Sequence, residues 1–323
     1  MATSYTPTNP IGTDGASGDR TLGIKLYSNE VLTYFARKNM FLDMVKTRTI
    51  NGGISSQFIV TGQASDTDAA SHTPGADVAA TVLKANERVI TITDRVYYSH
   101  FVDKLEEKIS QYEIRDELAK QAAEALATKI DKAVAKEIVK AVTAGAVDAA
   151  VPVLTAGVAG QKTGSIITAT GYTAATTTEA KGDKIVEALF EANADMNGKD
   201  VPEDGRTFIT TPLNYAQIVQ SQKAVNRDFT NGNGGIDTGN VLNIAGTPIK
   251  WSNHLPIGDA TLDPNSKLLG LFFQSGCVGV VKAMDITSES NYLPEKLGDL
   301  LTSYYALGMG LLEPARASVI IAD

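Results

Sequence analysis

Residues 111–143 read QYEIRDELAKQAAEALATKIDKAVAKEIVKAVT, a run without glycine or proline. Apolar side chains recur in this run at steps of three and four residues, which is the spacing of one face of an α-helix. We expect the stripe to be buried against a core, and its main members are Leu118, Leu126, Ile130, Val134 and Ile138. At 1.5 Å per residue the predicted helix is about 50 Å long.

Both ends of this predicted helix carry capping signals. Ser110 and Glu113 have the spacing of a capping box, and Gly145 is available for a left-handed stop. A usual helix has about 11–12 residues, so this one is too long for the core of one compact domain. It either spans a domain edge or forms the spine of an elongated subunit.

Charged residues are sorted along the same helix. Acidic residues lie near its start, and a lysine stripe lies near its end: Lys129, Lys132, Lys136 and Lys140. Complementation of the helix dipole would contribute about 0.3–1 kcal/mol at each end, and we prefer it because it needs no partner. The alternative is that the stripe meets DNA phosphates or an acidic partner surface.

Composition restricts the class of protein. The chain has 323 residues, 43% hydrophobic and 20% charged, which is ordinary for a folded soluble protein. A net charge of −8 gives no bulk attraction for nucleic acid or an anionic membrane. No stretch reaches about 18 apolar residues, so we expect no membrane span. Residues 1–20 lack the features of a secretion signal and are typical of a mobile arm.

The first hundred residues predict an arm, a short helix and a hairpin. A helix is expected over 29–40, with one apolar face made by Val31, Leu32 and Phe35. Residues 49–94 predict a long β-hairpin with one strand face made by Ile54, Ser56, Phe58 and Val60.

The hairpin tip at 63–86 is small and polar, and a connection of this length is usually functional or an interaction arm. Its large apolar side chains are too few to form a core, so we expect contact with a neighbouring subunit through Val78, Val82 and Leu83.

The remaining segments alternate irregularly between helix and strand, which predicts an α+β fold. We expect a strand at 95–104, loop with a hairpin in 145–178, a helix at 183–196, a strand at 206–210, a helix from Pro212, a flexible loop at 231–235, two strand segments kinked at Gly246 within 241–251, and strands at 267–274, 277–287, 300–314 and 318–323.

Motifs for catalysis or metal binding are weak. The sequence 157–163 (GVAGQKT) has Gln161 where a phosphate-binding loop needs glycine. The single cysteine, Cys277, excludes an internal disulfide, fits the cytosol, and lies in an apolar strand where an inert thiol is expected. The histidines are far apart and have no partner cysteine: His72, His100 and His254. We predict no catalytic centre, no metal and no cofactor.

Four blocks of sequence occur in an informative order. They are NEVLTYFAR at 29–37, ERVITIT at 87–93 leading to QYEIR at 111–115, VPEDGRTFITTPLNYAQIV at 201–219, and YYALGMGLLEPARASVII at 304–321. Together they resemble the HK97-fold major capsid proteins of tailed bacteriophages, most closely those of short-tailed podoviruses of the Autographiviridae type.

The resemblance implies an α+β, HK97-like capsid fold in five parts. These are an N-terminal arm with a short helix (1–48), an extended hairpin loop (49–94), a peripheral domain with the spine helix (95–144), an axial domain (145–275) and a return to the peripheral domain (276–323).

The resemblance also implies a function without catalysis. Such subunits form hexamers and pentamers that close an icosahedral shell around packaged double-stranded DNA, in a virion assembled in the cytoplasm of the host bacterium. The implied partners are other copies of the chain, a scaffolding protein during assembly, a portal at one vertex and the packaged DNA; no membrane is involved.

Two other functions stay open. One is an encapsulin-like shell of a cellular compartment, which uses the same fold to enclose enzyme cargo. The other is an α+β enzyme with an unrecognised site. The phage-like first and last blocks disfavour the compartment shell, and the scarcity of histidine and cysteine disfavours the enzyme.

Overall fold

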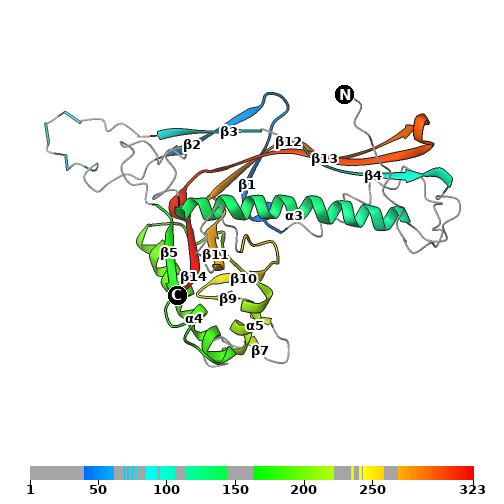
Figure 1. Ribbon diagram of the computed structural model, residues 1–323. Coiled ribbons are helices and arrows are strands. Elements are labelled where there is room, and N and C mark those ends of the chain that lie inside the picture. The colour runs from blue at the N-terminus through cyan, green and yellow to red at the C-terminus, as the bar shows by residue number, and fades with distance from the viewer. Residues whose placement is uncertain are drawn as a thin grey trace.

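The computed structural model describes residues 40–61, 69, 71–72, 74–75, 77–78, 85–92, 95–105, 114–143, 163–221, 234–235, 240–241, 243–257 and 268–323. Figure 1 shows an elongated upper part, in which helix α3 (Ile114–Thr143) lies along a long β-sheet. A second lobe of strands and helices lies beneath one end of α3 (Figure 1). Residues 29–39 of the helix predicted over 29–40 lie outside the described residues, as do the proposed cap Ser110–Glu113 and Gly145.

The upper sheet has four strands in the order β1-β12-β13-β4. Their bounds are β1 (Lys46–Thr49), β12 (Val278–Leu293), β13 (Gly298–Leu311) and β4 (Arg95–Asp103). The strands β12 and β13 form an antiparallel ribbon closed by η3 (Pro294–Lys296), and β4 adds to β13 in antiparallel orientation. One face of the ribbon packs on α3 through buried Leu301 and Tyr305, which explains why this helix can exceed the length of an ordinary domain core.

Strand β12 is longer than predicted. We expected it to end at residue 287, but it pairs with β13 through Leu293. Residues 288–292 are mostly polar, so the sequence does not indicate that the strand continues. This part of the ribbon extends past the core and therefore needs no alternation of apolar residues.

The predicted hairpin begins with β2 (Ser55–Thr61) and β3 (Ala85–Thr91), which pair in antiparallel register. Phe58 and Ile90 on its inner face pack with Val281 and Leu312. Gly310 of β13 permits this contact, because a Cβ there would lie 2.9 Å from Ile90 Cγ1. Ile54 does not share the buried face as predicted: it precedes the strand and is 76% exposed.

The lower lobe contains a six-stranded mixed sheet in the order β5-β14-β11-β6-β10-β9. The bounds are β5 (Ser165–Ala169), β14 (Ala317–Ala322), β11 (Leu268–Gln274), β6 (Arg206–Thr210), β10 (Thr247–Trp251) and β9 (Asn243–Ile244). The helices α4 (Thr178–Gly198) and α5 (Pro212–Gln220) belong to this lobe, and α4 packs on the sheet through Ile185, Leu189 and Met196, all fully buried or nearly so.

Three predictions for this lobe need correction. The expected hairpin within 145–178 is, in the described part, the single strand β5, which pairs in parallel with β14. The helix expected at 183–196 spans Thr178–Gly198, because the Thr177 hydroxyl accepts the Ala180 N–H and caps an earlier start. The expected kink at Gly246 is a tight turn between β9 and β10, with positive φ at Ala245 (50°) and Gly246 (76°).

Two further elements differ from expectation. The loop expected at 231–235 contributes β7 (Gly234–Gly235), which pairs with β8 (Asn240–Val241). The segment 276–323 does not return only to the upper part, because its last strand, β14, inserts between β5 and β11 of the lower sheet. The apolar sequence ASVIIA suits that central position, where most side chains are buried.

Candidate assembly surfaces and the family

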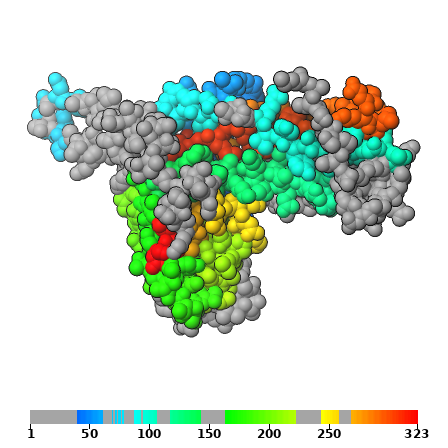
Figure 2. Space-filling model, viewed as in Figure 1, coloured from blue at the N-terminus to red at the C-terminus, as the bar shows by residue number. Residues whose placement is uncertain are grey.

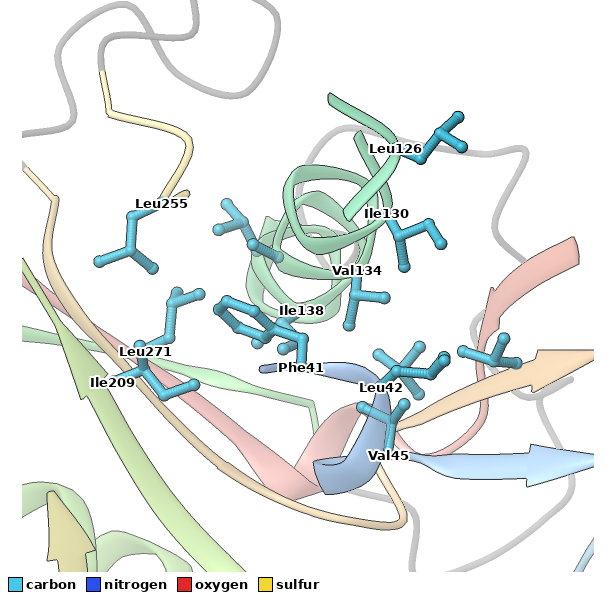
Figure 3. Close-up of a cluster of buried hydrophobic side chains, with 14 of the residues drawn as sticks. Phe41, Leu42, Val45, Leu126, Ile130, Val134, Ile138, Ile209, Leu255 and Leu271 are labelled. Atoms are coloured by element: carbon cyan, nitrogen blue, oxygen red, sulfur yellow. The ribbon is translucent and has the colours of Figure 1, made fainter. Parts of the chain in front are cut away.

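The buried face of α3 joins the upper part to the lower lobe. The five residues named from the sequence stripe are each at most 2% exposed: Leu118, Leu126, Ile130, Val134 and Ile138. Figure 3 shows Phe41 beside the helix, between it and Ile209 and Leu271 of the lower sheet. Phe41 also stacks on Phe273 with ring centroids 6.3 Å apart. One continuous core therefore connects the helix, both sheets and the first described residues.

A polar link at the same junction was missed by the sequence analysis. The buried Asp131 carboxylate lies 2.7 Å from His254 Nδ1 through Oδ2, and its Oδ1 accepts the Phe41 N–H at 3.2 Å. His254 Nε2 lies 3.3 Å from the Thr128 hydroxyl, one turn earlier on α3. Burial raises the pKa of Asp131, and the hydrogen bonds from His254 and Phe41 act in the opposite direction. The link ties three chain segments together.

Thr128 and Asp131 are three residues apart and therefore lie on one face of α3, which is the sequence pattern that indicates a polar contact at this position. The partner, His254, was not indicated, because it lies 123 residues from Asp131 in the chain. We predicted that His254 has no metal-binding role, and among the described residues no group of three or more His, Cys, Asp or Glu side chains could hold a metal ion.

The lysine stripe occupies the second half of α3. Lys129 and Lys132 are exposed, whereas Lys136 and Lys140 are half-buried. The Lys140 ammonium pairs with Glu137 at 2.6 Å. Lys140 alone of the four lies in the last turn, where a helix dipole acts most strongly.

The hairpin carries exposed apolar side chains. Val78 in the tip is 82% exposed. Val82 and Leu83 lie outside the described residues. On the outer face of the stem, Ile59 is 77% and Val89 is 53% exposed, so the hairpin offers apolar surface along its stem as well as at its tip.

The remaining candidate residues have structural surroundings. Cys277 is fully buried, and burial raises the pKa of its thiol far above the ordinary value, as expected for an inert side chain. Of the phosphate-loop-like sequence, only Thr163 is described. In the described parts of the chain, no helix is both long and apolar enough to cross a membrane.

The family follows from comparison with known proteins. A family model described as Gp10A-like major capsid protein matches residues 57–321. The chain belongs to this family. Its Gp10A-like relatives include the major capsid proteins of Escherichia phage T7 and Enterobacteria phage T3. The first is 29% identical, with 95% of this chain and 93% of the relative covered. The second is 28% identical, with 96% of each covered.

Solved structures agree with the Gp10A-like assignment. The capsid structure of cyanophage P-SCSP1u has a TM-score of 0.69 and 29% identity, and 88% of each chain is covered. The mature capsid of bacteriophage PhiM1 has the same TM-score at 16% identity, covering 88% of this chain and 87% of that one. A virus-like particle from Pyrococcus furiosus, at 12% identity and a TM-score of 0.55, shares the fold and covers 92% of this chain and 98% of that one.

These findings confirm the predicted resemblance and the α+β, HK97-like fold. They also decide between the functions left open. The protein is a major capsid protein of the Gp10A-like family, a structural family rather than an enzymatic one. The particle from Pyrococcus furiosus supports the fold alone, so it does not favour a cellular compartment shell.

Proposed function

We propose that this capsid protein forms hexamers and pentamers that close an icosahedral shell around packaged double-stranded DNA. Assembly would occur in the cytoplasm of the host bacterium, with a scaffolding protein and with a portal at one vertex. The observation that carries the proposal is the family match over residues 57–321 on an elongated subunit with an exposed hairpin. A subunit that contacts several neighbours can use such a shape.

The test is imaging of purified native particles by negative stain, with their nucleic acid and protein content measured. Closed shells that contain DNA are expected. Shells with protein cargo would indicate a compartment shell, and small oligomers without shells would contradict both readings.

The predicted division of the chain becomes a structural proposal. We assign the upper sheet and α3 to the peripheral domain, the lower lobe to the axial domain, and the β2–β3 hairpin to the extended loop. The lower lobe and the hairpin base each have an apolar cluster of their own, which supports this division, while the main cluster around α3 joins the upper sheet to the lower one. The last strand, β14, belongs to the axial domain in this assignment.

The hairpin tip provides a first prediction. We propose that residues 63–86 are ordered by a neighbouring subunit. An isolated two-stranded hairpin is marginal in water, and most of the Val78 side chain is not covered by its own chain. A nonspecific protease should cut the unassembled protein first within 63–86 or within 1–20. Assembled shells should protect 63–86, as mapped by mass spectrometry of the fragments. Equal protection in both states would show that the tip packs on its own subunit.

The lysine stripe provides a second prediction. The dipole explains Lys140, but its effect falls off within the last turn, and Lys129 and Lys132 lie well before it. We propose that the stripe faces packaged DNA. Replacing Lys132, Lys136 and Lys140 together by glutamine should leave shells intact, weaken DNA retention and make its dependence on salt shallower, because fewer counterions are released at the contact surface.

The matched control removes three lysines from the lower lobe: Lys181, Lys184 and Lys250, each to glutamine. DNA retention is measured in both variants across a series of salt concentrations. If the helix variant retains DNA like the parent and the control at every salt concentration, the stripe has only its role at the helix end.

A further inference from the structure

The described chain begins inside the core, at the junction of α3 and the lower lobe. Met40 packs against the main apolar cluster, and Phe41 is fully buried in it. The Phe41 N–H donates to Asp131 of α3. Residues 1–39 therefore join the rest of the protein at this junction.

Three exposed apolar side chains come from elements that meet near that junction. They are Trp251 (52% exposed), Ile257 (55%) and Leu213 (69%), and we call these three residues the Trp251 patch. Trp251 pairs with Thr210 at the ends of parallel strands β10 and β6, and Leu213 follows three residues later at the start of α5. In Figure 1 and Figure 2, the end of β10 and the yellow segment after it lie at the surface beneath α3.

His254 connects the patch to the first described residues. It lies midway between Trp251 and Ile257 in the chain, and its Nδ1 is 2.7 Å from Asp131. The same carboxylate accepts the Phe41 N–H. Leu255, from the same short loop, is buried near Phe41 in the shared core (Figure 3). The loop that carries Trp251 and Ile257 is thus linked through His254 and Asp131 to the place where residues 1–39 join the described chain.

The sequence just before Met40 has a matching apolar face. Val31, Leu32 and Phe35 share one side of the helix predicted over 29–40. At 1.5 Å per residue, Phe35 would lie about 8 Å and Val31 about 14 Å along the helix from Met40. A helix this short is marginal in water unless its apolar face is covered.

We propose that residues 29–39 dock on the Trp251 patch of their own chain through Val31, Leu32 and Phe35. The tether favours the same chain, because a segment joined at Met40 has a high effective concentration at a surface so close to its attachment. Docking would cover apolar area on both sides, and that burial is favourable. The N-terminal segment is then anchored twice, by Asp131 at Phe41 and by the Trp251 patch before it.

The chain contains its own reporter, since Trp251 is its only tryptophan. The test compares the unassembled full-length protein with a Leu32→Asp, Phe35→Asp variant. In the variant, Trp251 emission should move to longer wavelength, and quenching by acrylamide should rise about two-fold as the apolar cover leaves the ring. Thr33→Asp, on the opposite side of the predicted helix, should leave both signals at the parent values.

A crosslink provides a second measurement should the charged variant aggregate. In a Cys277→Ser background, Phe35→Cys with Ile257→Cys should form an intrachain disulfide on oxidation, whereas Thr33→Cys with Ile257→Cys should not. Unchanged emission and quenching in the charged variant, or an equal crosslink yield at positions 33 and 35, would overturn the proposal. A dependence of the parent signal on protein concentration, or crosslinks between chains only, would assign the segment to a neighbouring copy and also overturn it.

Discussion

Replacing Ile130 by aspartate should leave the protein insoluble or unassembled. Ile130 is 1% exposed at the middle of α3, inside the core that the helix shares with both sheets. An unpaired carboxylate at this position costs several kcal/mol, against a total stability of about 5–15 kcal/mol for a typical domain. Soluble yield and shell counts by negative stain measure the effect.

Lys129→Asp is the matched control, because it introduces the same side chain one residue earlier at an exposed position. Its charge change is larger, yet it should yield soluble protein and shells. Normal shells from the Ile130 variant would mean that the apolar stripe does not stabilise the junction. If neither variant gave soluble protein and shells, the negative charge added to the helix, and not the burial of Ile130, would explain the loss.

The long elements of the fold were predictable because their residue patterns are strong and local. The run 111–143 predicted a helix whose described part is Ile114–Thr143, and RTFIT predicted β6 at Arg206–Thr210. The helix is buried along one face, so its periodicity reports the environment directly, whereas β6 is buried on both faces and follows from its short buried-type sequence.

The pairing of distant segments could not be predicted from such patterns. Nothing in SIITA indicates that β5 pairs in parallel with β14, since a short apolar strand fits many neighbours. The polar end of β12 was missed because the ladder with β13 continues where no core selects apolar residues.

In the candidate surfaces, too, local patterns were predictable and contacts between distant segments were not. The five core residues of α3 followed from spacing alone, and each is buried. The link between Asp131 and His254 depends on a contact across two parts of the fold, so an isolated histidine in the sequence gave no indication of it. The hairpin tip was recognisable from its length and polarity, but the surface that would cover it belongs to another copy in our proposal.

Replacing Gly182 by valine should destabilise the lower lobe strongly. A Cβ at Gly182 of α4 would lie 2.1 Å from the carbonyl oxygen of Gln217 in α5, and 3.2 Å from Ser221 Cβ. Real atoms do not approach this closely, so the two helices must separate. The Ser221 hydroxyl, which donates to Asp183, and the Gln217 side chain, which accepts the Tyr172 hydroxyl at 3.0 Å, would be displaced together.

Overpacking of this kind costs about 3 kcal/mol, which corresponds to a fall of about 10 °C in melting temperature for a lobe of this size. Gly198→Val is the matched control, because it makes the same change at the end of the same helix, where a Cβ would meet no atom within 4 Å. Calorimetry of the unassembled protein should show the loss in the Gly182 variant and a change within about 0.5 kcal/mol in the control. Equal melting temperatures for the two variants would show that α5 can move away from α4 without loss, and that the close helix crossing does not hold the lobe together.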